Sequence, residues 1–310
     1  MIFSITGYLG SGKTTICEIL KEKFGFERVS AGSIQREIAK QMNMTILEFN
    51  KFLLESDGLN EYDKLTDDTM IKVAKDNKDK DLIFDSRMAW HFIPESFKIY
   101  ILVSPYEAAR RTYLVRASDD EKYESLDQAL NELVERRVVE NKKFKNVYGV
   151  NCEDLNQYDL VIDTTSITPD KAVEIIMDCY NKKVKKESYE KLWISPEALF
   201  PTKPLKEIDM NKLKKSYEAI ANHKEMKVKL LRFHDSLFIL DGHGVIIAYN
   251  LLKHPLINPI ITMDEEELKQ NKEVRKVIQV NEEDINIWAK LNGIVFNYCP
   301  KIIKKLEKEQ

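Results

Sequence analysis

Glycine and proline are scarce in this sequence, with 10 glycines and 9 prolines among 310 residues. Long disordered segments are usually rich in these residues, so their scarcity argues against such segments. Apolar residues make up 43% and charged residues 32% of the chain, which suffices for sizeable cores and a charged surface. Because 310 residues are more than one ordinary domain needs, we expect two domains.

Long apolar runs are also lacking. No stretch approaches the roughly 18 consecutive apolar residues that a membrane-spanning helix needs. The first residues, MIFSIT, resemble a strand and not the basic, apolar and cleavable segments of a secretory signal. We therefore expect a cytoplasmic protein with no membrane partner.

Cysteines are few and far apart. They stand at Cys17, Cys152, Cys179 and Cys299, and none belongs to a CxxC pair or to a cluster spaced with histidines. This spacing favours four ordinary reduced thiols over zinc ligands or disulfides.

The sequence has no large excess of charge of one sign, since its formal net charge is −3. A strongly basic chain would be expected to attract nucleic acids, and this one has no such global field. We expect no nucleic-acid partner for the chain as a whole, although a local basic patch in the C-terminal half is compatible with this composition. The sequence carries no prediction of oligomeric state.

The first half of the chain, from Met1 to about Tyr180, alternates short apolar runs with helical patterns. The apolar runs suit parallel strands buried on both faces, and we predict them at Ile2–Thr6, Leu82–Asp85, Ile99–Val103 and Leu160–Ile162. Helices are predicted between the strands, at Lys13–Phe24, Ile34–Met42, Thr45–Leu54, Tyr62–Lys75, Pro105–Val115, Leu126–Phe144 and Pro169–Tyr180. This alternation predicts an α/β domain over residues 1–182, with a parallel sheet flanked by helices.

The second half has a different pattern. The lysine-rich segment Asn181–Lys191 is either a linker or the solvated end of a helix. After it come the two prolines of Phe200–Pro204 and then a helix. Further on we expect strands, a turn and a helix in the order Lys227–Leu231, Ser236–Leu240, Asp241–Gly244, Val245–Leu252 and Ile257–Thr262, before a charged, helix-rich tail. These elements predict a smaller α+β domain over residues 192–310.

One motif carries a specific chemistry. The residues from Gly7 to Thr14, GYLGSGKT, fit G-x-x-x-x-G-K-[ST] between a predicted strand and a predicted helix, which is the context that this phosphate-binding loop requires. The backbone N–H groups of such a loop wrap a phosphate, so side chains are unwelcome at its glycines, and the helix N-terminus adds a partial positive charge. We expect ATP to contact the residues Gly7, Gly10, Ser11, Gly12, Lys13, Thr14 and Thr15. The Lys13 ammonium can reach the β- and γ-phosphates, and the Thr14 hydroxyl can ligate Mg²⁺.

A second candidate site lies at the end of the strand Leu82–Asp85. In proteins with this loop, a carboxylate at that place holds the metal, although a strand-terminal Asp can also simply cap a turn. Arg87 follows two residues later, at the carboxyl edge of the sheet where ligands bind. A guanidinium group is suited to bidentate capture of a phosphate, so we expect Asp85 and Arg87 to form part of the site.

Four separated segments resemble nucleoside monophosphate kinases, and cytidylate kinases in particular. They are the phosphate-binding loop, Ser30-Ala-Gly-Ser-Ile-Gln-Arg36, Asp85-Ser-Arg87-Met-Ala-Trp and the stretch Lys142–Asp163, which is similar to the segment that closes the core of archaeal-type cytidylate kinases. The resemblance covers about the first 180 residues. It implies phosphoryl transfer from ATP, with Mg²⁺, to a nucleoside monophosphate, for which CMP or dCMP is our first expectation.

The resemblance also implies roles for individual residues. Arg36, Arg87 and Asp85 would contact the acceptor monophosphate, Ser30 and Gly32 would line its pocket, and helices between Gln35 and Asp76 would form a flap over it. The lid would carry cationic side chains at Arg110, Arg111, Arg116, Arg136 and Lys143. Lys13, Asp85, Arg116 and Arg136 would be the catalytic residues, because a loose phosphoryl-transfer transition state needs its charge neutralised. For Arg110, Arg111 and Arg136, an exposed helix face is the alternative interpretation.

The sequence departs from the family pattern in the lid. Where the family often has a second arginine, Lys142-Lys143-Phe144 supplies only lysines. A lysine is a point charge and does not make the forked contact of an arginine. The identity of the base therefore stays open at this stage.

The second half faintly resembles the ParB/sulfiredoxin-like fold. The similarity rests on Leu199-Phe-Pro201, a following helix and Phe238-Ile-Leu-Asp-Gly-His243. The arginine that this superfamily places after the histidine is missing. Asp241 and His243 would hold a nucleotide or a metal under this resemblance, while the alternative is a turn that begins a helix.

Three hypotheses follow for the whole chain. The first is an enzyme, a nucleoside monophosphate kinase. The second is a nucleotide-gated binding protein whose ParB-like half binds DNA or another partner. The third keeps the kinase and lets the second half sense a pyrimidine nucleotide as feedback.

Overall fold

The computed structural model describes residues 1–45, 48–49, 52, 61–115, 123–233, 236–263, 274–294 and 299–308. The chain divides into two compact units. The first consists of Met1–Thr164 and Thr168–Lys191, and the second consists of Leu192–Gln310 with Thr165–Ile167. In the described part of the chain, no helix is both long enough and apolar enough to cross a membrane.

A six-stranded sheet in the order β2-β3-β1-β4-β5-β6 is built mostly from the first unit. The strands are β1 (Ile2–Gly7), β2 (Glu27–Ser30), β3 (Leu82–Asp85), β4 (Phe97–Leu102), β5 (Leu160–Asp163) and the two-residue β6 (Leu192–Trp193). The pairs β2–β3, β3–β1, β1–β4 and β4–β5 are parallel, so their carboxyl ends share one edge. All strands except β6 belong to the first unit.

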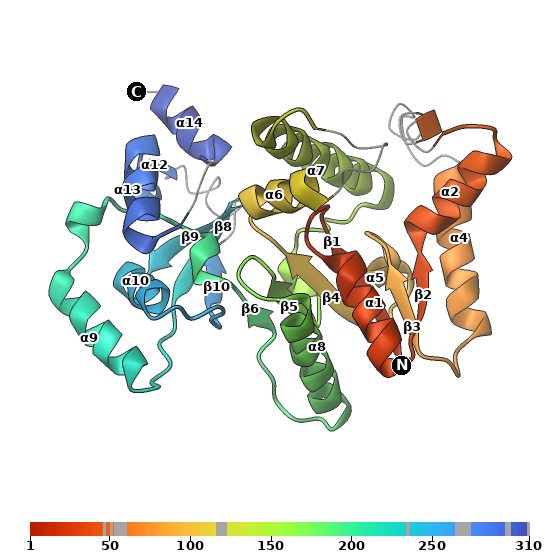
Figure 1. The fold of residues 1–310 in the computed structure, drawn as a ribbon, viewed down its shortest axis with the longest axis horizontal. Helices are drawn as coiled ribbons and strands as arrows, with labels where there is room; N and C mark the ends of the chain where they lie inside the picture. The colour runs from red at the N-terminus through yellow and green to blue at the C-terminus, as the bar shows by residue number, and fades with distance from the viewer. Residues whose placement is uncertain are drawn as a thin grey trace. The chain divides into compact units, whose positions relative to one another are not determined.

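Helices flank this sheet, as the alternating pattern predicts. They are α1 (Lys13–Phe24), α2 (Ala31–Gln41), α4 (Glu61–Asp76), α5 (Ala89–Phe92), α6 (Pro105–Val115), α7 (Leu126–Tyr148) and α8 (Pro169–Val184), with the short 3₁₀ helix η1 (Leu155–Gln157). Figure 1 shows α1 and α8 packed side by side against the strands. The predicted parallel sheet with flanking helices is confirmed, and α1 and α6 have the predicted bounds.

The second unit contains a mixed four-stranded sheet in the order β10-β8-β9-β7. Its strands are β7 (Leu199–Pro201), β8 (Lys229–Phe233), β9 (Ser236–Asp241) and β10 (Ile260–Met263), and only β8 and β9 pair antiparallel. Its helices are η2 (Pro196–Ala198), η3 (Leu205–Glu207), α9 (Met210–Ala221), α10 (His243–Leu251), α12 (Val274–Val277), α13 (Glu282–Asn292) and α14 (Lys301–Lys308). An apolar core that includes Phe238, Ile285 and Ile303 joins strands to the last helices.

Several element predictions were wrong, for identifiable reasons. The strands β2 and β7 were missed because each pairs with only one neighbour, at an edge where polar residues and Pro201 are tolerated. For the segment Asn181–Lys191, where a linker and a helix end were both open, the structure shows the end of α8 up to Val184, with two lysines in its last turn. The strand expected at Ile257–Thr262 is β10, which begins only at Ile260.

Two further expectations need comment. The turn predicted at Asp241–Gly244 is shorter than expected, because α10 begins at His243 after Gly242 in a left-handed conformation. The helix predicted at Thr45–Leu54 lies mostly outside the described residues.

Candidate active site

The phosphate-binding loop adopts a backbone that only glycine accepts easily. Gly7, Gly10 and Gly12 have φ values of 144°, 79° and 85°. A Cβ atom on Gly7 would lie 2.4 Å from the carbonyl oxygen of Ile101, and one on Gly10 would lie 2.5 Å from that of Ala108. The loop is therefore closely packed against β4 and α6, and its glycines are required by space as well as by conformation.

The loop and the start of α1 form a cradle suited to an anion. The first turn of α1 holds no acidic residue, and its N-cap, Gly12, offers no side chain, so the helix N–H groups are available. The Ser11 hydroxyl is buried without a hydrogen-bond partner among the described residues. The Lys13 ammonium donates to the carbonyl oxygen of Tyr8 at 3.3 Å, while Thr14 and Thr15 are exposed. These features fit the phosphates of a nucleotide.

The charged form of the Lys13 ammonium group is disfavoured in the free protein. Burial and, after it, the nearby Arg87 guanidinium lower its pKa to about 8, against the opposing effect of Asp85. An anion bound to the loop would raise this pKa again, because a negative charge nearby favours the charged ammonium.

Asp85 ends β3 beside β1 and is held by an arginine that the sequence analysis missed. Arg28 on β2 donates to Asp85 Oδ2 at 2.6 Å and to Glu18 Oε1 on α1 at 2.8 Å. Asp85 is only 9% exposed, so this ion pair orients the carboxylate at the sheet edge. No local signal pointed to Arg28, because its strand was itself not predicted.

Thr14 and Asp85 are chemically suited to Mg²⁺, which prefers hydroxyl and carboxylate oxygens. The described residues contain no group of three or more His, Cys, Asp or Glu side chains that could hold a metal ion. A magnesium ion here would therefore be held by few protein ligands together with water and nucleotide phosphates, which is its usual coordination at such sites.

Arg87 and Arg136 share one carboxylate. Glu140 on α7 forms an ion pair with Arg87 and accepts from Arg136 Nε at 2.9 Å. Burial by itself would raise the pKa of Glu140, but the two guanidinium groups hold that pKa below its ordinary value. The structure thus brings together the predicted acceptor residue and a predicted lid residue through a negative charge that the sequence analysis did not single out.

A further arginine, Arg137, lies next to the loop. It is 8% exposed, and its guanidinium carbon lies 3.9 Å from the centre of the Tyr8 ring. The sequence contained a signal for this position, since Leu130, Leu133, Val134 and Arg137 repeat at helical spacing along the buried face of α7. A pocket beside the loop is lined by Tyr8, Leu9, Arg87, Pro105, Ala108, Leu133, Val134, Arg136 and Arg137.

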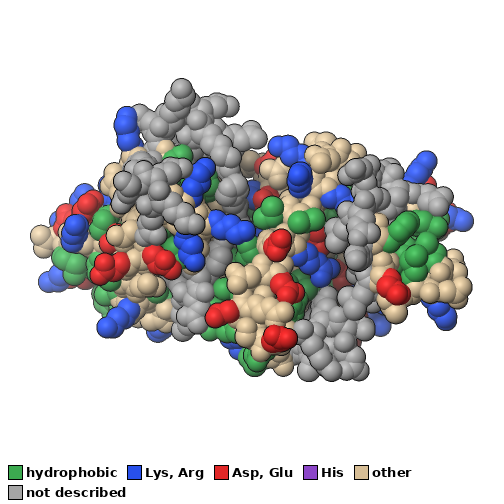
Figure 2. Space-filling model, turned by 90° about the horizontal axis from the view of Figure 1, so that it is seen from above, with side chains coloured by type: hydrophobic (Ala, Val, Ile, Leu, Met, Phe, Trp, Pro, Cys, Tyr) green, Lys and Arg blue, Asp and Glu red, His purple; other side chains and the backbone are tan. Residues whose placement is uncertain are grey.

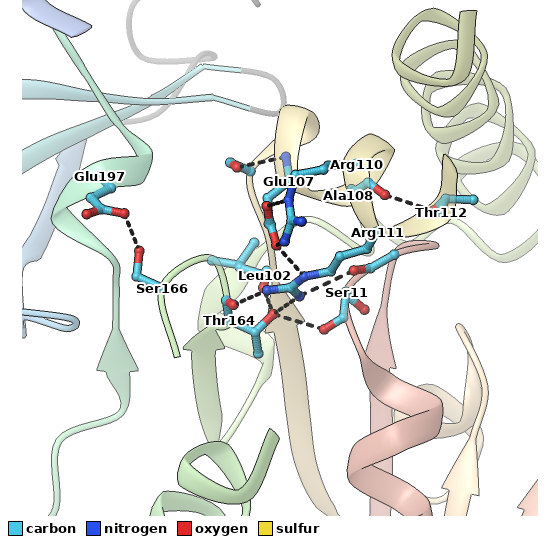
Figure 3. A network of polar contacts seen from close by, with 12 residues as sticks. Ser11, Leu102, Glu107, Ala108, Arg110, Arg111, Thr112, Thr164, Ser166 and Glu197 are labelled. Carbon is cyan, nitrogen blue, oxygen red and sulfur yellow. Dashed lines mark hydrogen bonds and ion pairs between the residues drawn. The ribbon is translucent and has the colours of Figure 1, made fainter. Parts of the chain in front are cut away.

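The two arginines of α6 differ from each other (Figure 3). Arg110 is half exposed and makes a bidentate contact with Glu107 of its own helix. Its Nε and Nη2 atoms donate to the two carboxylate oxygens at 2.7 and 2.8 Å. Arg111 contacts Glu107 at 2.7 Å and also reaches Thr164 and the carbonyl oxygen of Gly10, so it ties α6 to the loop. Thr164 in turn donates to the carbonyl oxygen of Ser11 at 2.9 Å. The other expected lid arginine, Arg116, lies outside the described residues.

Three of the residues expected around the acceptor, Ser30, Gly32 and Arg36, lie together at the start of α2. A Cβ atom on Gly32 would lie 3.7 Å from both Ser30 Oγ and Arg36 Nη1, so these three positions are neighbours. The side chain of Arg36 is exposed and donates to Ser33 Oγ at 3.3 Å.

The helices α4 and α7 are joined by two polar contacts. Lys143 forms an ion pair with Asp63 at 2.8 Å, with both side chains largely buried. Tyr148 donates to Asp67 at 2.7 Å, and burial raises the pKa of Asp67 to about 6. In the structure the Lys143 ammonium therefore links the expected lid helix, α7, to α4 of the expected flap.

In the second unit, the His243 side chain is buried and held by neighbouring residues. Its Nε2 atom accepts from the backbone N–H of Thr202 at 3.1 Å, and its ring packs edge-on against Trp288. Burial lowers the pKa of His243 to about 4, so the ring stays neutral at ordinary pH. Asp241 is exposed at the end of β9. His243 thus forms part of the packing of the second unit.

Comparisons with known proteins point to one family. The model of the cytidylate kinase-like family matches residues 2–166. The cytidylate kinase of Methanocaldococcus jannaschii is 34% identical over 171 residues, covering 53% of this chain and 89% of that protein. The cytidylate kinase of Pyrococcus furiosus is 32% identical over 177 residues, covering 57% of this chain and 86% of that protein.

Similar solved structures include an uncharacterized protein from Eubacterium ventriosum, with a TM-score of 0.43 and 16% identity, covering 58% of this chain and 98% of that one. Another is shikimate kinase from Bacteroides thetaiotaomicron, with a TM-score of 0.40 and 12% identity. The match covers 58% of this chain and 98% of the shikimate kinase chain. Family membership rests on the sequence match, which extends over more than half of the residues and includes the loop, Asp85, Arg87 and the arginines of α7. The chain therefore belongs to the cytidylate kinase-like family.

Proposed function

We propose that this protein transfers the terminal phosphoryl group of ATP to a nucleoside monophosphate, and that CMP or dCMP is the preferred acceptor. The observation that carries the proposal is the gathering of Lys13, Asp85, Arg87 and Arg136 around the glycine-rich cradle. Lys13 lies within electrostatic reach of Arg87, Asp85 and Glu140. Family membership and the names of the relatives support the same reaction.

The donor side consists of the loop and the start of α1. The backbone N–H groups, the Ser11 hydroxyl and the Lys13 ammonium would bind the phosphates of ATP, as their geometry allows. Thr14 and Asp85 would hold Mg²⁺, which supplies positive charge next to the phosphates when it is bound. Arg28 would keep the Asp85 carboxylate in place.

The acceptor side consists of Arg36 and Arg87, with Ser30 and Gly32 in the pocket. Arg87 would exchange its ion pair with Glu140 for the phosphate of the acceptor, because both partners are anions that suit a guanidinium group. No general base is required, since the attacking phosphate oxygen already carries negative charge.

The lid side would neutralise the charge that develops during transfer. Arg136 of α7 and Arg116 would cover the transferring group, and Lys143 stands where the family often has an arginine. Closure of such a lid also excludes water, which suppresses hydrolysis of ATP. Because Lys143 pairs with Asp63 on α4, closure of the lid and of the flap would be linked.

A coupled assay with ATP, Mg²⁺ and each of CMP, dCMP, UMP, AMP and GMP tests the proposal. We expect turnover, with the highest kcat/KM for CMP or dCMP. The Lys13→Ala variant should lower kcat by about 100-fold or more, because a preorganised positive charge is lost.

A matched control is Lys21→Ala on the same helix. Lys21 is 57% exposed and lies 3.7 Å from Glu18, so its removal should change kcat by less than about twofold. Absence of turnover with all five acceptors, in protein that still binds ATP, would exclude the proposed reaction.

No observation favours the alternative in which the second unit binds DNA. On the face shown in Figure 2, Lys and Arg side chains are interspersed with Asp and Glu side chains over the described surface. A continuous basic stripe, which would favour nucleic-acid binding, is not seen on the described part of that face.

A further inference from the structure

The second residue of the phosphate-binding loop, Tyr8, is an aromatic side chain beside two guanidinium groups. The guanidinium carbon of Arg137 lies 3.9 Å from the ring centre, and that of Arg87 lies 4.8 Å from it. Both distances are within the range of a cation–π interaction. The ring is 8% exposed, so these interactions are little screened by water.

The hydroxyl group of Tyr8 fixes the orientation of the ring. It donates to Glu153 Oε1 at 2.7 Å and accepts from Asn141 Nδ2 at 2.6 Å. Burial raises the pKa of Tyr8 well above its ordinary value, so the hydroxyl keeps its proton. The backbone carbonyl of Tyr8 meanwhile accepts from Lys13 at 3.3 Å and from the N–H of Ser11 at 3.2 Å. One residue thus contacts the donor loop, α7 and the segment after α7.

The ring and Glu140 hold Arg87 in chemically different ways. Glu140 forms an ion pair with the Nη1 atom of Arg87, so an incoming phosphate competes with Glu140 for the guanidinium group. An aromatic face attracts the same cation through its π electrons and uses none of the five N–H donors. Tyr8 can therefore keep Arg87 and Arg137 in place while phosphate oxygens take their N–H groups.

We propose that Tyr8 is a positioning residue that aligns Arg87 and Arg137 for the phosphate of the acceptor nucleotide. This inference rests on the proposed kinase function and adds a determinant of acceptor affinity within the donor loop. It also predicts that the effect falls on the acceptor, because the glycines and N–H groups that bind ATP do not depend on the ring.

The test compares Tyr8→Phe with Tyr8→Leu in the full-length protein. The Phe variant keeps the ring and loses the hydroxyl contacts, and the Leu variant loses both. We expect Tyr8→Leu to raise the KM and the calorimetric Kd for CMP by about tenfold, and to change those for ATP by less than about threefold. The Phe variant should restore the acceptor KM to within about threefold of the wild type.

The control is Tyr158→Phe, which removes a buried hydroxyl that donates to the carbonyl oxygen of Cys152 at 2.7 Å. It should leave both KM values within about twofold, and the unfolding temperature of each variant should be measured alongside. Equal effects of Tyr8→Leu on ATP and CMP, or no effect on either, would overturn the inference. A wild type that turns over no acceptor would refute the proposed function and this inference together, whereas an active wild type with an unaffected Leu variant would refute only the inference.

Discussion

At the scale of single residues, Lys13 combines burial with a neighbouring positive charge. Burial and then Arg87 lower its pKa to about 8 in the free protein. Bound phosphates would favour the ammonium form and raise this pKa again. Between about pH 8 and the higher pKa of the complex, the complex holds more protons than the free protein, so nucleotide binding takes up a proton.

We predict that the affinity for ATP falls above pH 8, by up to about tenfold per pH unit. Calorimetric titrations at pH 8.5 in two buffers of different ionisation enthalpy measure the uptake of protons. The Lys13→Arg variant is the control, because a guanidinium group stays charged at this pH and should show no uptake. The same uptake in that variant would assign the proton to another group.

At the scale of elements, the junction of β1, the loop and α1 depends on close approach to α6. Gly10 and Gly25 have nearly the same φ, 79° and 76°, but different surroundings. A Cβ atom on Gly10 would meet the carbonyl oxygen of Ala108 at 2.5 Å, while one on Gly25 would have nothing within 4 Å. The two positions therefore separate the cost of backbone conformation from the cost of packing.

We predict that Gly25→Ala lowers the free energy of unfolding by about 1–2 kcal/mol, which is the cost of a left-handed non-glycine residue. Gly10→Ala should cost more and should also weaken ATP binding at least about tenfold, because the loop has to move away from α6. Urea unfolding and ATP titration of both variants measure these effects. Equal losses of stability with unchanged ATP affinity would show that α6 does not constrain the loop.

At the scale of the whole molecule, each of the two units has an apolar core built from its own residues. The core around Phe238, Ile285 and Ile303 consists only of residues of the second unit, and the core around Phe84 and Met70 consists only of residues of the first. Since the proposed site for ATP lies in the first unit, a nucleotide should stabilise that unit alone.

We predict two calorimetric unfolding transitions in the full-length chain. ATP with Mg²⁺ at about 100 times its Kd should raise one of them by roughly 5–10 °C and leave the other unchanged. The Lys13→Ala variant, in which we expect weaker ATP binding, should lose this shift. A single transition, or an equal shift of both, would show that the units unfold together.

Much of the fold of the first half could be predicted, because its signals are local. The glycine-rich loop between a strand and a helix, and the apolar strands β1, β3, β4 and β5, are readable from short stretches of sequence. The edge strands β2 and β7 could not be predicted, since their sequences are short and partly polar or contain proline. They become strands only by pairing with β3 and β9. The same applies to Arg28, whose partner Asp85 is 57 residues away.

The sequence by itself determined the loop, the strand-and-helix alternation and the residue types at the site, because each follows from neighbours within a few positions. Only the tertiary structure decided which charges meet. Arg110 and Arg111 are adjacent, yet the rotation of about 100° per residue along a helix sends one onto its own helix surface and the other onto the loop. Glu140 lies four residues after Arg136 on α7, a spacing at which side chains meet on one helix, but its ion pair with Arg87 forms only because α7 lies near the residues that follow β3. Ion pairs of this kind depend on packing between distant segments, and no local pattern encodes it.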